Sequence, residues 1–178
     1  MKTFLRLTSL AATVAALALT AAPAQAASLV SATPQAKAKV KILKALTLTR
    51  NADLDFGTVV LSGSGAWGGE VVSVDTAGAR VCGGGTNLTC SAATTAAAYN
   101  VTGSNNAVVN VTVPASVVIS NGSANLTVTT SKSIGASVTM PNSGNAGVDF
   151  NIGGSITLAS TTADGFYQGD IVVTADYQ

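Results

Sequence analysis

The chain has 178 residues, a net charge of +1, two cysteines and no histidine. The absence of histidine excludes Ser-His-Asp triads, histidine acid–base catalysis and histidine-rich metal sites. Charged residues make up 10% of the chain, against about 25% in an ordinary soluble domain, and the net charge gives no electrostatic footprint for nucleic acid. We therefore expect no enzyme, no metal or cofactor and no nucleic-acid partner.

Residues 1–26 have the three parts of a secretory signal peptide. Lys2 and Arg6 give a positive start, an apolar stretch covers residues 5–19, and Ala24-Gln25-Ala26 is a small-x-small cleavage site. Because the apolar stretch is interrupted and shorter than a membrane span, we favour cleavage after Ala26 over a retained anchor. We expect export, with no integral membrane segment after processing.

Two cysteines, Cys82 and Cys90, lie either side of a short glycine-rich stretch. Export leads to an oxidising compartment, which favours a disulfide that closes a small loop. The alternative, a redox-active pair, is more often spaced Cys-x-x-Cys.

After the signal the pattern is that of an all-β chain, because apolar residues alternate with Thr, Asn and Ser between turn residues. The expected strands cover residues 56–61, 71–74, 97–101, 109–113, 117–119, 125–128, 136–140, 148–152 and 156–158, followed by a long strand over 166–177. Regular short strands of this kind indicate a sandwich or a barrel. Five Asn-x-Ser/Thr sequons begin at Asn87, Asn100, Asn110, Asn121 and Asn125. Four of them read Asn-Val-Thr or Asn-Leu-Thr, which the same alternation explains, and we do not expect glycosylation.

A basic segment precedes the domain. In an extended chain its lysines and its apolar residues occupy opposite edges, namely Lys37, Lys39 and Lys41 against Ala36, Ala38, Val40 and Ile42, with Lys44 out of phase. From residue 45 onward the net charge is −5. Three interpretations are open: a first strand with a charged edge, a solvated tail that contacts anionic surfaces, or a strand that completes the sheet of another molecule.

Four segments, in order, carry a family resemblance: residues 46–60 (LTLTRNADLDFGTVV), 99–103 (YNVTG), 150–158 (FNIGGSITL) and 165–177 (GFYQGDIVVTADY). They resemble the bacterial family catalogued as domain of unknown function 4402, which looks related to spore coat protein U domains and Mat/Ecp-type fimbrial subunits among the chaperone–usher pilins. The most specific part is the C-terminus, where Tyr177 is penultimate.

The resemblance implies an incomplete immunoglobulin-like β-sandwich that lacks one strand and is completed by a strand donated from the next subunit. It divides the chain into a signal peptide (1–26), an N-terminal extension (27–44) and a pilin-like domain (45–178) with its first strand at 45–50. The donor residues would be Ala36, Ala38, Val40 and Ile42, with pairing beginning after Pro34. The groove edge, read first by a chaperone, would contain Gly165, Tyr167, Ile171, Val173 and Tyr177.

The function implied by the resemblance is a structural subunit of a bacterial surface fibre, a pilus or fimbria. Its partners would be identical or sister subunits, a periplasmic chaperone and an outer-membrane usher. It would pass through the periplasm to the cell surface, and adhesion and biofilm roles would belong to the assembled fibre.

The alternative is a self-sufficient secreted sandwich that binds carbohydrate or a cell-surface polymer. Trp67 is the only tryptophan and lies in a glycine-rich loop, where an exposed ring would stack on a sugar. A ring that closes the end of the sandwich is the competing interpretation of this residue. Asp53 and Asp55 are better explained by a turn than by the paired carboxylates of a glycosidase.

Overall fold

The computed structural model describes residues 28–142 and 146–178. The predicted signal peptide, residues 1–26, lies outside the described residues. Residues 41–178 belong to one compact unit, and residues up to Val40 belong to another. In the second unit the extension from Ser28 to Val40 contains no strand, and its side chains are exposed. The described residues contain no helix that is long and apolar enough to span a membrane.

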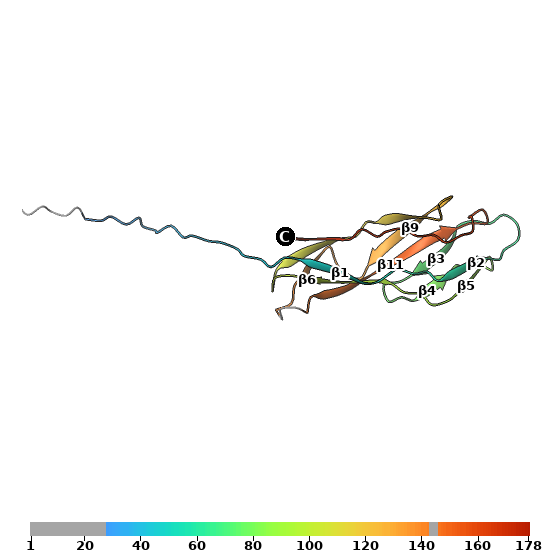
Figure 1. Ribbon diagram of the computed structural model, residues 1–178, viewed down its shortest axis with the longest axis horizontal. Coiled ribbons are helices and arrows are strands. Elements are labelled where there is room, and N and C mark those ends of the chain that lie inside the picture. The colour runs from blue at the N-terminus through green and yellow to red at the C-terminus, as the bar shows by residue number, and fades with distance from the viewer. Residues whose placement is uncertain (1–27, 143–145) are drawn as a thin grey trace, which may run out of the picture. The chain divides into compact units, whose positions relative to one another are not determined.

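The main unit is an all-β, antiparallel sandwich, as predicted. Its strands are β1 (Thr47–Ala52), β2 (Thr58–Leu61), β3 (Glu70–Val74), β4 (Arg80–Cys82), β5 (Leu88–Ser91), β6 (Ala97–Thr102), β7 (Val108–Thr112), β8 (Ser116–Ser120), β9 (Asn125–Lys132), β10 (Ser137–Thr139), β11 (Val148–Leu158) and β12 (Thr174–Tyr177). Figure 1 shows β9, β11 and β3 running side by side through the middle of the unit.

One layer is a seven-stranded sheet. Its main path runs β1-β6-β11-β3-β4, and β9 pairs with the other edge of β11 and carries β8 outside it. The facing layer consists of two small sheets, β10-β7-β12 and β2-β5. The two layers enclose two apolar clusters: one joins Phe150 and Ile152 of the large sheet with Val109 and Val111 of β7, and the other joins β3, β9 and β11 with Leu88 of β5.

The long strand β11 corrects the prediction of two strands with a break at Gly153-Gly154. It pairs with β6 over Val148–Ile152 and with β3 over Gly154–Leu158. Both partners lie on the same edge of β11, so β3 replaces β6 as the neighbouring strand at the two glycines. A Cβ on Gly153 would lie 2.5 Å from the backbone oxygen of Val74. The glycines therefore permit a close approach of β3 and do not form a turn.

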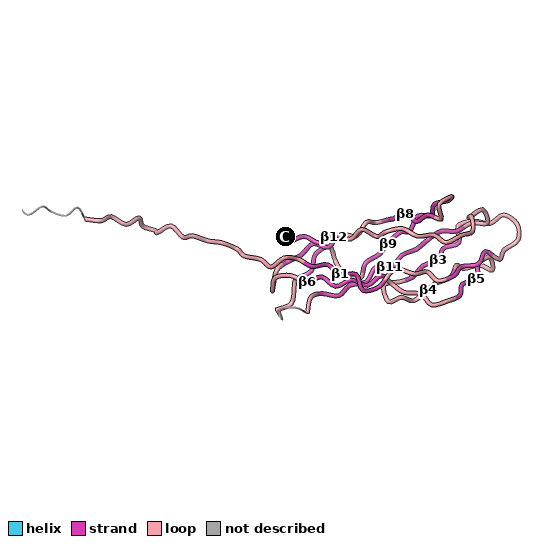
Figure 2. The backbone as a smooth tube through the Cα atoms, in the orientation of Figure 1, coloured by secondary structure: helices cyan, strands magenta, loops and turns pink. Residues whose placement is uncertain are grey.

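The C-terminal segment is also different from the prediction of one strand over residues 166–177. Only Thr174–Tyr177 forms a ladder, with β7, and one isolated bridge joins Gln168 to Ser120. The rest of the long connection from β11 to β12 is a loop (Figure 2). Glycine weakens the interior of a strand, and Gly169 lies within this loop.

Candidate strand-accepting groove

A groove of about 1390 Å³ runs along the sandwich between residues 53–61 and residues 162–171. Its floor consists of alternate, inward-facing residues of four strands of the large sheet, because successive side chains in a strand point to opposite faces. These residues are Ala97 and Tyr99 of β6, Val117 and Ile119 of β8, Leu126 and Val128 of β9, and Ile156 and Leu158 of β11.

The floor is apolar but not fully covered. Val128 is 2% exposed and Leu158 is 4% exposed, whereas Val117, Ile119 and Leu126 are only half-buried. All of them belong to or pack against the same core cluster. The groove thus leaves part of the hydrophobic core accessible along its length.

One wall of the groove is an edge strand. Strand β2 pairs with β5 through Thr58–Leu61, and within the described residues no strand pairs with its other edge. The opposite wall, residues 162–171, is joined to β8 by two backbone hydrogen bonds between Gln168 and Ser120, of 2.9 and 3.1 Å. The Asn121 side chain, directly after β8, also donates a hydrogen bond of 2.9 Å to the backbone oxygen of Asp164. An unpaired strand edge offers backbone donors and acceptors to an added strand.

A disulfide and an arginine hold β5 and the segment that leads into β2 against the large sheet. The Cys82–Cys90 disulfide, as predicted, links β4 of the large sheet to β5 of the small one. The Arg80 guanidinium donates hydrogen bonds to the backbone oxygens of Phe56 (3.2 Å) and Ser91 (2.8 Å). No pattern in the sequence predicted this role of Arg80, because its acceptors are backbone atoms that only the fold brings close.

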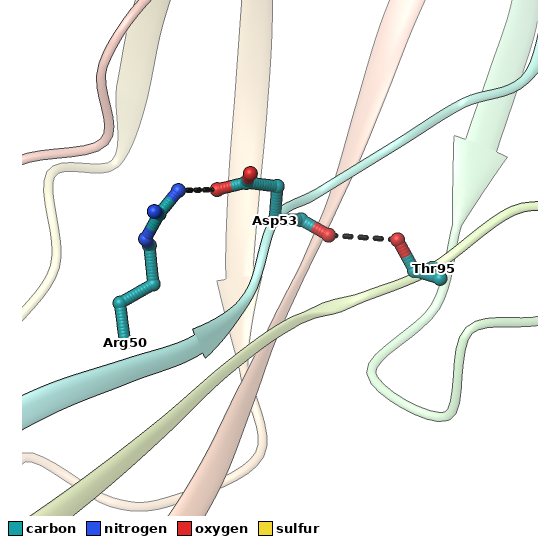
Figure 3. A network of polar contacts seen from close by, with 3 residues as sticks. All are labelled: Arg50, Asp53 and Thr95. Carbon is teal, nitrogen blue, oxygen red and sulfur yellow. Dashed lines mark hydrogen bonds and ion pairs between the residues drawn. The ribbon is translucent and has the colours of Figure 1, made fainter.

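The rims of the groove carry carboxylates, Asp53 and Asp55 on one side and Asp164 and Asp170 on the other. Arg50 forms an ion pair with Asp53, and the Asp53 backbone oxygen accepts a hydrogen bond of 2.8 Å from Thr95 (Figure 3). The side chain of Asp55 accepts a hydrogen bond of 2.8 Å from the backbone of Gly57, in agreement with the predicted turn. The proximity of the four carboxylates was not predicted from the sequence, because more than a hundred residues separate the two pairs.

Tyr99 lies in the floor near Arg50 and stacks on Phe150, with ring centroids 5.5 Å apart and an interplanar angle of 13°. Burial raises the pKa of the Tyr99 phenol above its ordinary value of 10.0, with Arg50 opposing the shift and Asp53 adding to it. The neutral phenol is therefore the form that the folded protein favours.

Of the residues predicted for the groove edge, Gly165, Tyr167 and Ile171 line the groove. Val173 and Tyr177 lie further along and pack against the other core cluster. Gly165 has a φ of 137°, and a Cβ there would lie 2.9 Å from the Asn121 side chain. The conformation therefore requires glycine at this position.

Tyr177 connects the C-terminus to the point where the extension enters the domain. Its hydroxyl donates to the backbone oxygen of Lys44 at 2.6 Å and accepts from the backbone N–H of Ser104 at 2.7 Å. The base of the extension is thus fixed at Lys44.

The predicted donor residues carry no strand pairing. Ala36 and Ala38 are exposed, Val40 is 82% exposed and Ile42 is 85% exposed.

Trp67 is a half-buried residue that packs against the second core cluster. Its backbone exchanges hydrogen bonds with Ser160, and its Nε1 atom is buried, with no hydrogen-bond partner among the described residues. The ring therefore packs against the core and is partly covered by it.

No curated protein and no solved structure matches the sequence of this chain. A family model, Domain of unknown function (DUF4402), matches residues 46–177, which is most of the chain and nearly all of the sandwich. The protein therefore belongs to the DUF4402 family.

Proposed function

We propose that this protein is an exported structural subunit of a bacterial surface fibre, polymerising when the extension of one subunit adds a strand to the next. The observation that carries the proposal is the groove, where half-buried core residues lie beside the unpaired edge of β2. An added strand would satisfy that edge and cover the floor. Periplasmic chaperone and usher partners, and a final place at the cell surface, belong to the same proposal.

The extension has the chemistry that the groove requires. Ala36, Ala38, Val40 and Ile42 alternate over seven residues and present an apolar edge when extended. Burial of each large aliphatic residue is worth about 1.5–3 kcal/mol. Val40 and Ile42 would therefore supply most of the apolar contribution.

Carbohydrate binding has less support. The residue that suggested it, Trp67, is half-buried against the core with its Nε1 atom buried. We do not propose an enzymatic role.

The test compares the polymerisation of three processed chains that begin at residue 27. In the first variant Val40→Asp and Ile42→Asp place charges on the proposed donor edge. In the matched control Leu29→Asp and Val30→Asp change two residues that are as exposed, at 98% and 94%, but precede Pro34. Sedimentation velocity measures the size distribution of each chain.

We expect polymers from the wild-type and control chains and monomers from the donor variant. Because all four substituted residues are exposed, the changes leave the folded domain intact, which circular dichroism checks. Equal polymerisation of the donor variant, or a wild-type chain that stays monomeric at high concentration, would overturn the proposal.

A further inference from the structure

The carboxylates of the domain are concentrated at the groove. Residues 45–178 contain eight carboxylate side chains, and four of them, Asp53, Asp55, Asp164 and Asp170, line the groove, two on each rim. All four are exposed at its mouth. An apolar floor is thus flanked by negative charge on both sides.

Three of these carboxylates have no cationic partner. The Arg50–Asp53 contact is the one ion pair within residues 28–142 and 146–178, which leaves Asp55, Asp164 and Asp170. The carboxylates of Asp164 and Asp170 also accept no hydrogen bond from a described residue, so they are available to an external cation.

The extension carries positive charges that complement the negative charges of the rims. Lys37, Lys39 and Lys41 alternate with the apolar donor residues, so in an extended strand they share one face at intervals of about 7 Å. With the apolar face on the groove floor, the lysines lie at the mouth, between the two rims. Residues 36–42 span about 20 Å when extended, which is also the greatest span of residues 164–170.

The occupant to which we commit is a second copy of this chain, because the proposed function joins copies head to tail. Within one molecule Tyr177 holds the backbone of Lys44, so that Ile42, two residues away, lies within about 7 Å of that point. The extension of a second copy carries the same charges and is not tied in this way to the domain whose groove it enters.

We propose that the rim carboxylates select residues 36–42 of a second copy of this chain by pairing with Lys37, Lys39 and Lys41. This inference rests on the proposed function, since it assumes that the groove accepts a strand. The charge pairs add selectivity and faster association to the apolar contacts, and they make assembly sensitive to salt.

The experiment measures the binding of fluorescent peptides of residues 27–44 to the processed chain. That chain carries Val40→Asp and Ile42→Asp, so that its own extension does not compete. One peptide has the wild-type sequence, and the other carries Lys37→Glu, Lys39→Glu and Lys41→Glu. Anisotropy gives both dissociation constants at about 0.01 M salt, where the Debye length is about 30 Å, and at about 1 M, where it is about 3 Å.

The second part of the experiment reverses the charge of the rim. The receptor then also carries Asp164→Lys and Asp170→Lys, and Asp176→Lys, an exposed carboxylate on β12 outside the groove, is the matched control. A receptor with Asp164→Asn and Asp170→Asn replaces the reversed one if the latter does not fold. With it we expect the preference between the two peptides to shrink.

We expect the Glu peptide to bind the unreversed rim at least about tenfold more weakly at low salt, because three modest exposed pairs change sign together. The difference should disappear at high salt. The preference should invert on the reversed rim and stay unchanged in the Asp176→Lys control.

Equal binding of both peptides at all salt concentrations would overturn the charge pairing and leave the donated strand in place. No binding of either peptide at any salt concentration would overturn both the pairing and the proposed function.

Discussion

At the scale of single residues, the hydroxyl of Tyr177 is the most connected side-chain atom near the C-terminus. It joins Lys44 and Ser104, which are 133 and 73 residues away in sequence. Tyr167 offers a matched comparison, because its hydroxyl donates to Ala163, only four residues away, at 2.8 Å. The two phenols differ in whether their hydrogen bonds are long-range or local.

We expect Tyr177→Phe to lower the free energy of unfolding by about 1–3 kcal/mol, because two backbone groups lose their partner. Tyr167→Phe should have a clearly smaller effect, since the exposed Ala163 oxygen is rehydrated. Urea denaturation followed by circular dichroism measures both. Equal losses in the two variants would contradict a special role for the contact at Lys44.

The buried phenol of Tyr99 predicts a pH dependence. Its pKa is raised in the folded state, so the folded chain holds this proton more tightly than the unfolded chain does. The stabilisation is present in full below about pH 10, the pKa of an unfolded tyrosine, and is lost as the pH rises through the folded-state pKa. Tyr99→Phe should remove this part of the alkaline destabilisation, as urea midpoints at neutral and alkaline pH would measure. Parallel curves for wild type and variant would contradict it.

At the scale of elements, β11 is one continuous strand where the sequence pattern predicted two. The pattern of alternation predicted residues 148–152 and 156–158 correctly, but Gly153-Gly154 indicated a turn. In the fold the glycines lie where β3 replaces β6 as the partner. A local signal cannot distinguish a turn from a close approach, because the approaching backbone is remote in sequence.

We expect Gly153→Ala to destabilise the protein by about 1–3 kcal/mol, as overpacking does, because its Cβ would meet the backbone of β3 at 2.5 Å. Gly84→Ala is the matched control, since a Cβ there meets nothing within 4 Å, and its effect should stay within about 0.5 kcal/mol. Thermal or urea denaturation measures both variants. A Gly153→Ala protein as stable as the control would show that β3 moves aside freely.

At the scale of the whole molecule, the proposed exchange has a definite symmetry. The extension and the groove are different surfaces of one chain, so the contact between copies is heterologous and extends into a fibre unless the rotation closes a ring. A subunit that accepts a strand but cannot donate one should end the growth of such a fibre.

We therefore expect small amounts of the Val40→Asp, Ile42→Asp chain to shorten wild-type polymers in proportion to its fraction. Its groove is unchanged, and its extension no longer offers an apolar edge. Electron microscopy of mixed samples gives the length distribution, with the Leu29→Asp, Val30→Asp chain as control. Lengths that do not depend on the added donor variant would contradict head-to-tail exchange.

The sequence by itself determined the all-β class, most strand positions, the disulfide and the family. These depend on local alternation, on cysteine spacing and on short motifs, which are readable in one stretch of chain. Only the tertiary structure decided the continuity of β11, the short ladder of β12, the place of Arg80 and the gathering of Asp53 and Asp55 with Asp164 and Asp170 at one groove. Each of these depends on which distant strands become neighbours, and strand pairing across a hundred residues leaves no periodic signal in either strand alone.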